Sequence, residues 1–127
     1  MNYLYAPESF TAREKIYKEL CKAIGNENRL AMFADIKGLS ARLRSFNNPE
    51  IVTFLSVKLV DMPSITAIRE LFRDAAFIIL LSDGDQTAFD MSIRLNPKFV
   101  GMMKEDLDKI EPIVKKLVVK YQRNRSR

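Results

Sequence analysis

Apolar residues occur in five short runs that are separated by amphipathic stretches along the whole chain. The runs cover residues 2–6, 29–34, 51–57, 77–81 and 99–103. The run at 51–57 is almost continuously apolar and rich in β-branched and aromatic residues, which is typical of a strand covered on both faces. We therefore expect five short strands, at least one of them in the middle of a sheet.

Between these runs, apolar residues recur every three or four positions, which predicts amphipathic helices. The helical stretches cover residues 9–24, 36–46, 65–72 and 107–121. Gly25 follows the first stretch at the position of a C-terminal cap, and Asn47-Asn48-Pro49 is expected to end the second. Pro112 lies inside the last stretch, so that helix either begins close to Asp108 or bends at the proline.

Residues 86–95 fit either a helix or a strand. Ala88 and Met91 lie at helical spacing, whereas the apolar residues between Phe89 and Leu95 alternate strictly with polar ones. As a strand, this segment would form a hairpin with 77–81, and the domain would become an α+β arrangement. As a helix, it makes strands and helices alternate throughout the chain. That regularity favours the helix, because right-handed crossovers then build the whole sheet by one rule.

The helical alternative predicts an α/β fold with a doubly wound, five-stranded parallel sheet. This is the flavodoxin-like (βα)5 three-layer sandwich. The 127 residues, of which 47% are hydrophobic, are sufficient for one globular domain. We expect this domain to cover residues 1–121 and a frayed basic tail to cover 122–127.

The net charge of +5 comes from the end of the chain. The last thirteen residues hold six basic side chains and no acidic one, and the first 114 residues hold fifteen basic and sixteen acidic ones. Cations at a helix C-terminus complement its dipole without any partner. A nucleic-acid-binding domain spreads basic residues over a folded face, so nucleic acid is the weaker alternative. The candidate partner-binding residues are Lys115, Lys116, Lys120 and Arg123.

Composition argues against most enzyme classes. The chain has no histidine and one cysteine, Cys21. Ser-His and Cys-His nucleophile pairs, histidine-bound zinc and an internal disulfide are therefore excluded. No apolar stretch approaches the roughly 18 residues that a membrane span needs, and residues 1–6 do not resemble a signal peptide. We expect a cytoplasmic protein that is not an enzyme and needs no cofactor, metal or membrane.

Four stretches, taken in their order and spacing, resemble a known family. They are PESFTAREKI (7–16), VTFLSVKLVDMPSITAIREL (52–71), FIILLSDGD (77–85) and FVGMMKEDL (99–107). Over nearly its whole length the chain resembles a response-regulator receiver domain of the CheY-like superfamily. The resemblance implies bacterial two-component signal transduction, with phosphorelay chemistry at the carboxyl ends of the strands.

That chemistry needs an aspartate after the third strand, an Mg²⁺-binding acidic pair after the first, a hydroxyl after the fourth and a lysine after the fifth. The resemblance places the aspartate position on Ser56 and the acidic pair on Pro7 and Glu8. It places the hydroxyl on Ser82 and the lysine on Lys104. Because serine has no carboxylate, the resemblance implies a degenerate pocket, and we expect a pseudo-receiver that is not phosphorylated at the usual position.

The expected function is a non-catalytic regulatory module that acts through protein–protein interaction. A homodimer through the fourth helix, fifth strand and fifth helix is the arrangement that the family suggests. Glu8 and Asp61 are weak candidates for a cation, and a phosphodonor acting on Ser56 or a nearby aspartate is an alternative within the family. If 86–95 is a strand, the alternative is a small α+β chaperone-like or adaptor domain that binds an extended polypeptide.

Overall fold

The computed structural model describes residues 1–25, 29–45 and 49–125, with side chains up to Tyr121. Its five strands form one sheet in the order β2-β1-β3-β4-β5, and every neighbouring pair is parallel. The strands are β1 (Asn2–Tyr5), β2 (Leu30–Phe33), β3 (Ile51–Val57), β4 (Ala76–Leu81) and β5 (Phe99–Met102). The predicted doubly wound, five-stranded parallel sheet is confirmed.

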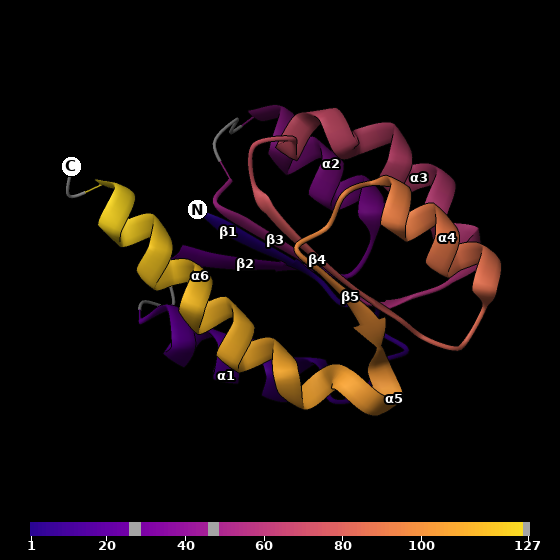
Figure 1. The fold of residues 1–127 in the computed structure, drawn as a ribbon, viewed down its shortest axis with the longest axis horizontal. Helices are drawn as coiled ribbons and strands as arrows, with labels where there is room; N and C mark the ends of the chain where they lie inside the picture. Colours follow the sequence, from indigo (N-terminus) through magenta and orange to yellow (C-terminus); the bar gives the residue numbers. More distant parts are fainter. Residues whose placement is uncertain (26–28, 46–48, 126–127) are drawn as a thin grey trace.

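Helices cover both faces of the sheet, which gives three layers (Figure 1). One face is covered by α1 (Arg13–Ile24) and α6 (Ile110–Arg125), and the other by α2 (Ile36–Ser45), α3 (Met62–Ile68) and α4 (Gln86–Arg94). The shorter helical segments are η2 (Leu59–Asp61), η3 (Arg69–Phe72), α5 (Met103–Asp106) and η4 (Leu107–Lys109).

The apolar run of β3 supplies both hydrophobic cores. Val52 and Phe54 pack in the core beneath α2, α3 and α4, whereas Ile51 and Leu55 pack in the core beneath α1 and α6. β4 is likewise buried along its whole length. Because both faces of these central strands are covered, their sequences read as continuous apolar runs and not as alternating ones.

Residues 86–94 form the helix α4, so the predicted helix is confirmed and the alternative strand is wrong. The Asp85 carboxylate caps the helix by accepting a hydrogen bond from the Ala88 N–H at 2.9 Å. The alternation that suggested a strand does not mark a buried face, because Phe89 and Ile93 remain 37% and 49% exposed. The hairpin and the α+β chaperone-like or adaptor domain depended on that strand and are set aside with it.

The ends of the first and last helices follow from glycine and proline. Gly25 adopts a φ of 89° and its N–H donates to the Cys21 carbonyl at 2.9 Å, which is the predicted C-cap. Pro112 lies in the first turn of α6, where its missing N–H breaks no helical hydrogen bond. α6 runs to Arg125, so helical structure continues past Tyr121, where we expected a tail to begin.

Asn47 and Asn48 of the predicted stop signal lie outside the described residues. In the ranges that the structure describes, no helix has both the length and the apolar character needed to cross a bilayer.

Candidate functional site

The carboxyl ends of the parallel strands lie along one edge of the sheet, where open α/β sheets bind ligands. Val57 of β3 pairs with Leu81 of β4, and the N–H of Ser82 donates to the Val57 carbonyl at 2.8 Å. This register brings Ser56 and Ser82 to neighbouring strand ends. Of the four residues predicted to form the pocket, the fold therefore places these two serines next to each other.

Ser56 has an unusual backbone conformation. Its φ is 54°, and the pairing between β3 and β4 shifts register between Phe54 and Val57. A side chain with a Cβ is disfavoured in this left-handed region, and such residues cluster at functional or structurally constrained positions. Its neighbours Leu55 and Val57 are apolar and 0% and 1% exposed. The end of β3 therefore presents a hydroxyl, with no carboxylate on either side.

The first carboxylate after β3 belongs to Asp61 and is engaged in a turn. Asp61 Oδ2 accepts a hydrogen bond from the Lys58 N–H at 2.9 Å, and the Asp61 N–H donates to the Lys58 carbonyl at 2.9 Å. These two bonds close η2 and fix the carboxylate on its own backbone. Asp61 thus acts as a turn residue, which accounts for its position without a bound cation.

Tyr5, the last residue of β1, contributes a phenol near this edge. Burial raises the pKa of the Tyr5 hydroxyl above its ordinary value, and the negative charges of Asp61 and Asp35 raise it further. Asp35 follows β2, and its Oδ1 accepts a hydrogen bond from the Gly38 N–H at 2.6 Å. The phenol is consequently neutral at physiological pH and offers a hydrogen-bonding group, not a charge.

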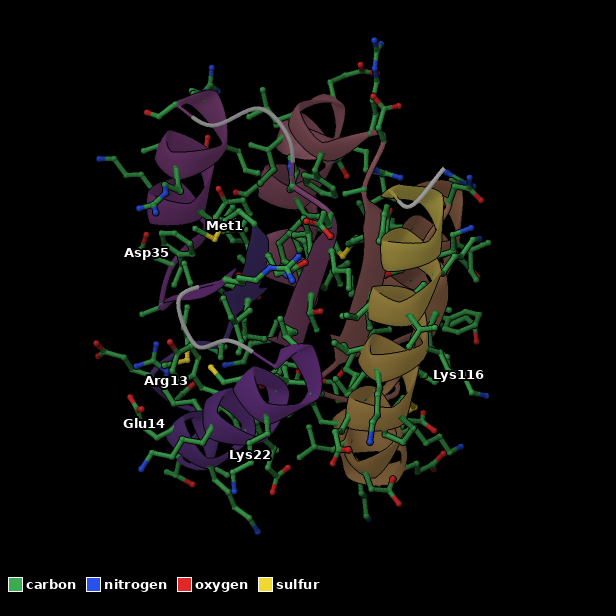
Figure 2. All side chains as sticks on the ribbon, turned by 90° about the vertical axis from the view of Figure 1, so that its left-hand side faces the viewer. Met1, Arg13, Glu14, Lys22, Asp35 and Lys116 are labelled. Carbon is green, nitrogen blue, oxygen red and sulfur yellow. The ribbon has the colours of Figure 1, made fainter. Side chains whose placement is uncertain are left out.

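The loop after β1 carries a fixed positive charge that the sequence did not reveal. Arg13, at the start of α1 (Figure 2), donates from Nε to the Ala6 carbonyl at 2.9 Å. Glu8 in the same loop is exposed. The guanidinium therefore stands on the loop where the family resemblance placed a pair of Mg²⁺-binding acids. A lone arginine seven residues from a carbonyl gives no sequence signal for such a contact.

The lysine after β5 that forms an ion pair is Lys109, not Lys104. The Asp106 carboxylate accepts hydrogen bonds from Lys109 Nζ at 2.8 Å and from the Met102 N–H at 2.9 Å. The hydrogen bond from Lys109, the one from Met102 and the nearby positive charge lower the pKa of Asp106. Lys104 is exposed on α5.

Taken together, the predicted pocket is only partly assembled. Across the described ranges, no hydrogen bond or ion pair joins Glu8, Ser56, Ser82 and Lys104 to one another. In those same ranges, no three cysteine or acidic side chains gather closely enough to hold a metal ion. The structure brings the two serines to adjacent strand ends and leaves the glutamate and the lysine in solvent.

The acidic residues after β4 have structural roles. Asp85 caps α4, and Asp83 Oδ1 accepts the Asp85 N–H at 3.2 Å. Beside them, a small apolar pocket of about 150 Å³ lies between Leu81, Phe89 and Met102. It opens near the exposed side of α4 and next to the edge strand β5.

The described basic side chains of α6 do not line a common pocket. Lys115, Lys116 and Lys120 are all exposed, and Figure 2 shows Lys116 extending from α6 away from the sheet. Lys115 lines a groove against α1 together with Glu19 and Glu111, whereas Lys120 lines a different pocket. The side chain of Arg123, the fourth candidate, lies outside the described residues.

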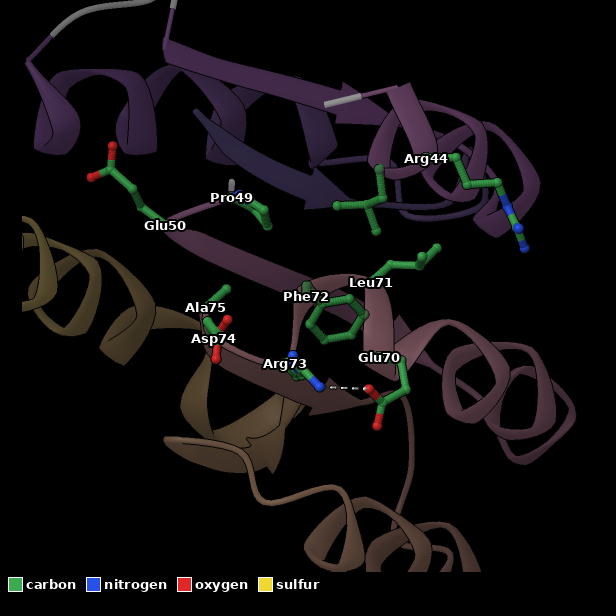
Figure 3. Close-up of a pocket in the computed structure, with 10 residues that line it drawn as sticks. Arg44, Pro49, Glu50, Glu70, Leu71, Phe72, Arg73, Asp74 and Ala75 are labelled. Atoms are coloured by element: carbon green, nitrogen blue, oxygen red, sulfur yellow. Dashed lines mark ion pairs between the residues drawn. The ribbon is translucent and has the colours of Figure 1, made fainter. Parts of the chain in front are cut away.

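A pocket of about 600 Å³ lies at the opposite edge of the sheet, where β3 and β4 begin (Figure 3). Its charges are mixed and several are already paired. Arg73 and Glu70 form an ion pair at 3.5 Å, and Glu50 pairs with Arg29 at 3.2 Å. This pairing favours a structural role for the charged groups of the pocket.

The sequence matches no protein-family model and no curated protein. Solved structures do share the fold. A response regulator receiver domain protein (CheY-like) from Methanospirillum hungatei superposes with a TM-score of 0.74 at 12% identity, over 97% of each chain. A chemotaxis protein of the CheY type from Vibrio cholerae gives 0.69 at 12% identity, over 91% of this chain and 97% of that one.

A third similar structure, from Burkholderia pseudomallei, is of a protein described as pilus assembly-related. It gives a TM-score of 0.67 at 11% identity, over 94% of this chain and 90% of that one. At such low identities the likeness concerns the course of the backbone and not the chemistry of the site. The chain has the fold of response-regulator receiver domains.

Proposed function

We propose that this chain is a receiver-like regulatory module that acts through protein contacts and not through phosphorylation of an aspartate after β3. The observation that carries the proposal is the sequence at the end of that strand. Leu55, Ser56 and Val57 offer no carboxylate, so moving the comparison by one residue in either direction does not supply one. Asp61, the next acid along the chain, is held by the Lys58 N–H.

The loop after β1 supports the same proposal. Mg²⁺ prefers carboxylate oxygens in near-octahedral geometry and gives up its water reluctantly. Pro7 offers no ligand side chain, Glu8 is exposed, and the Arg13 guanidinium is fixed on the Ala6 carbonyl. A positive charge at this place opposes cation binding. We infer a module without a resident metal and without catalytic activity.

Incubation with acetyl phosphate and Mg²⁺, followed by intact-mass measurement, tests this part. An active receiver domain treated in the same tube is the positive control. The expected result is no phosphoryl mass on this chain while the control is modified. A phosphoryl adduct that disappears in Ser56→Ala or in Asp61→Asn would overturn the proposal and would identify the acceptor.

For the protein contact, the exposed side of α4 is the best-supported surface. Phe89 and Ile93 lie one turn apart, so they form a continuous apolar patch. β5 beside it is an edge strand with an unpaired backbone edge. The exposed Asp90 and Arg94 on the same helix give this surface charges of both signs. We infer that this surface binds a second copy of the chain. A two-fold axis brings the patch of one copy against the same patch of the other and places opposite charges across from each other.

Sedimentation equilibrium measures this association directly. We expect the chain to dimerise in a concentration-dependent way and the Phe89→Ser/Ile93→Ser variant to be a monomer. Val60→Ser is the matched control, because Val60 is 78% exposed in η2 and lies outside the patch. A monomeric wild-type chain, or equal weakening by the control, contradicts the proposed dimer.

A further inference from the structure

A pocket of about 320 Å³ that is lined by charged residues lies at the end of the sheet where the strands begin, on the far side from Ser56. It is assembled from segments far apart in the sequence, because the C-terminal part of α6 lies beside the edge where the strands begin (Figure 1). Its charged lining residues are four cations and one acid, namely Arg69, Arg73, Lys98, Lys120 and Asp74. The pocket is therefore positively charged although the body of the chain is nearly neutral.

Arg69 forms a fixed wall of this pocket. Its Nε donates to the Leu95 carbonyl at 2.8 Å and its Nη1 to the Phe72 carbonyl at 2.9 Å. The guanidinium carbon also lies 4.9 Å from the centre of the Phe72 ring and 5.2 Å from that of Phe77. These contacts hold the arginine in place, so it contributes charge with little freedom to move.

Lys98 and Lys120 are the cations that remain available. Both are exposed, and among the residues that the structure describes neither ammonium group forms a hydrogen bond or an ion pair. Their backbones are nevertheless anchored. The Lys98 N–H donates to the Phe77 carbonyl at 2.7 Å, and the hydroxyl of Tyr121, beside Lys120, accepts the Ala76 N–H at 3.1 Å.

We propose that this pocket binds a small soluble anion that carries two or more phosphoryl groups. Like charges lining one cavity repel each other, and an anion between them removes that repulsion. Lysine ammonium and arginine guanidinium groups are the side chains that bind phosphate most effectively. The volume is at the lower end of the range for small-ligand sites, roughly 300–1,000 Å³. The site lies at the end of the sheet opposite Ser56 and is not lined by Phe89 or Ile93, so it goes beyond the function proposed above.

Isothermal titration calorimetry with inorganic triphosphate, on the full chain at low ionic strength, tests the site. We expect Lys98→Gln and Lys120→Gln each to weaken binding about three- to fivefold, which is the upper part of the range for one solvent-exposed charge contact. Lys116→Gln is the matched control, because it removes the same charge from the same helix and does not line the pocket. Its affinity should stay within about twofold of wild type. Thermal melts of all four chains check that each is folded.

Three outcomes would overturn the proposal. The first is that the wild-type chain does not bind triphosphate. The second is that Lys116→Gln weakens binding as much as Lys120→Gln, which would indicate diffuse attraction to the basic helix. The third is that the chain binds phosphatidylcholine vesicles containing phosphatidylinositol bisphosphate but not free triphosphate, since the phosphoryl groups would then belong to a lipid.

Discussion

Substitutions at Ser56 distinguish a left-handed backbone at the end of β3 from an ordinary extended one. The φ of 54° is unfavourable for any residue with a Cβ and most unfavourable for a β-branched one. In an extended strand the order is reversed, because β-branched residues are favoured and glycine is disfavoured. The variants Ser56→Gly and Ser56→Val should therefore change the free energy of unfolding in opposite directions.

The size of the effect follows from two terms. A left-handed conformation costs a non-glycine residue about 1–2 kcal/mol. Glycine avoids that cost but loses about 0.5–1 kcal/mol more backbone entropy on folding. Ser56→Gly should therefore leave the free energy of unfolding unchanged or raise it by up to about 1.5 kcal/mol. Ser56→Val should lower it, with a gap of about 2 kcal/mol between the two variants.

Urea unfolding followed by circular dichroism measures this gap as a shift in midpoint at constant slope. For a chain of this length, 2 kcal/mol corresponds to about 8 °C in melting temperature. Ser56→Ala, which keeps the Cβ and removes the hydroxyl, is the control and should stay close to wild type. If valine is at least as stable as serine and glycine is the least stable, the end of β3 is extended and the reasoning fails.

Three further substitutions have defined expectations. Because the pKa of Tyr5 is raised, the folded chain keeps the phenol proton to higher pH than the unfolded chain does. The contribution of this phenol to the free energy of unfolding is therefore complete below pH 10.0 and is lost as the pH rises through the pKa of the folded state. In urea melts above pH 10.0, Tyr5→Phe should lose less of its free energy of unfolding than wild type does. A Cβ at Gly101 would lie 2.9 Å from the Asp106 carboxyl carbon, so Gly101→Ala should cost about 1–3 kcal/mol and less in an Asp106→Ala background. Arg69→Lys should lower the free energy of unfolding by about 1–3 kcal/mol, because lysine cannot reproduce the planar pair of hydrogen bonds to the Leu95 and Phe72 carbonyls. Arg73→Lys, at an exposed position, is the control and should change it by no more than about 0.5 kcal/mol in chemical denaturation.

Most of the fold could be predicted from the sequence because its central strands are covered on both faces. The boundaries of β3 match the apolar run at 51–57. Residues 86–95 were harder, because alternation and helical spacing were both present. Asp85 decides between them through its cap on the Ala88 N–H. A cap residue can be recognised in the sequence. Whether it outweighs the alternating apolar pattern depends on which side chains of the segment are buried in the folded chain.

The site was less predictable because its decisive features are single side-chain contacts and the backbone conformation of one residue. The contact between Arg13 and Ala6, the left-handed Ser56 and the pairing of Lys109 in place of Lys104 have no periodic signal. The basic end of α6 also looked like a single cluster in the sequence. In the helix its lysines point in different directions, and Lys120 instead joins cations from η3 and the start of β5.

This separation between core and strand ends explains how the fold can persist while the residues at the strand ends change. Phe54 and Leu55 in the middle of the sheet are fully buried, whereas Glu8 and Lys104 are exposed and contribute little to packing. Exposed substitutions usually change stability by no more than about 0.5 kcal/mol, so the residues of such a pocket can change while the layers remain intact. A shared backbone at 11% or 12% identity is therefore compatible with different chemistry. It follows that the reaction with acetyl phosphate, and not a closer superposition, decides whether the edge at Ser56 still accepts a phosphoryl group.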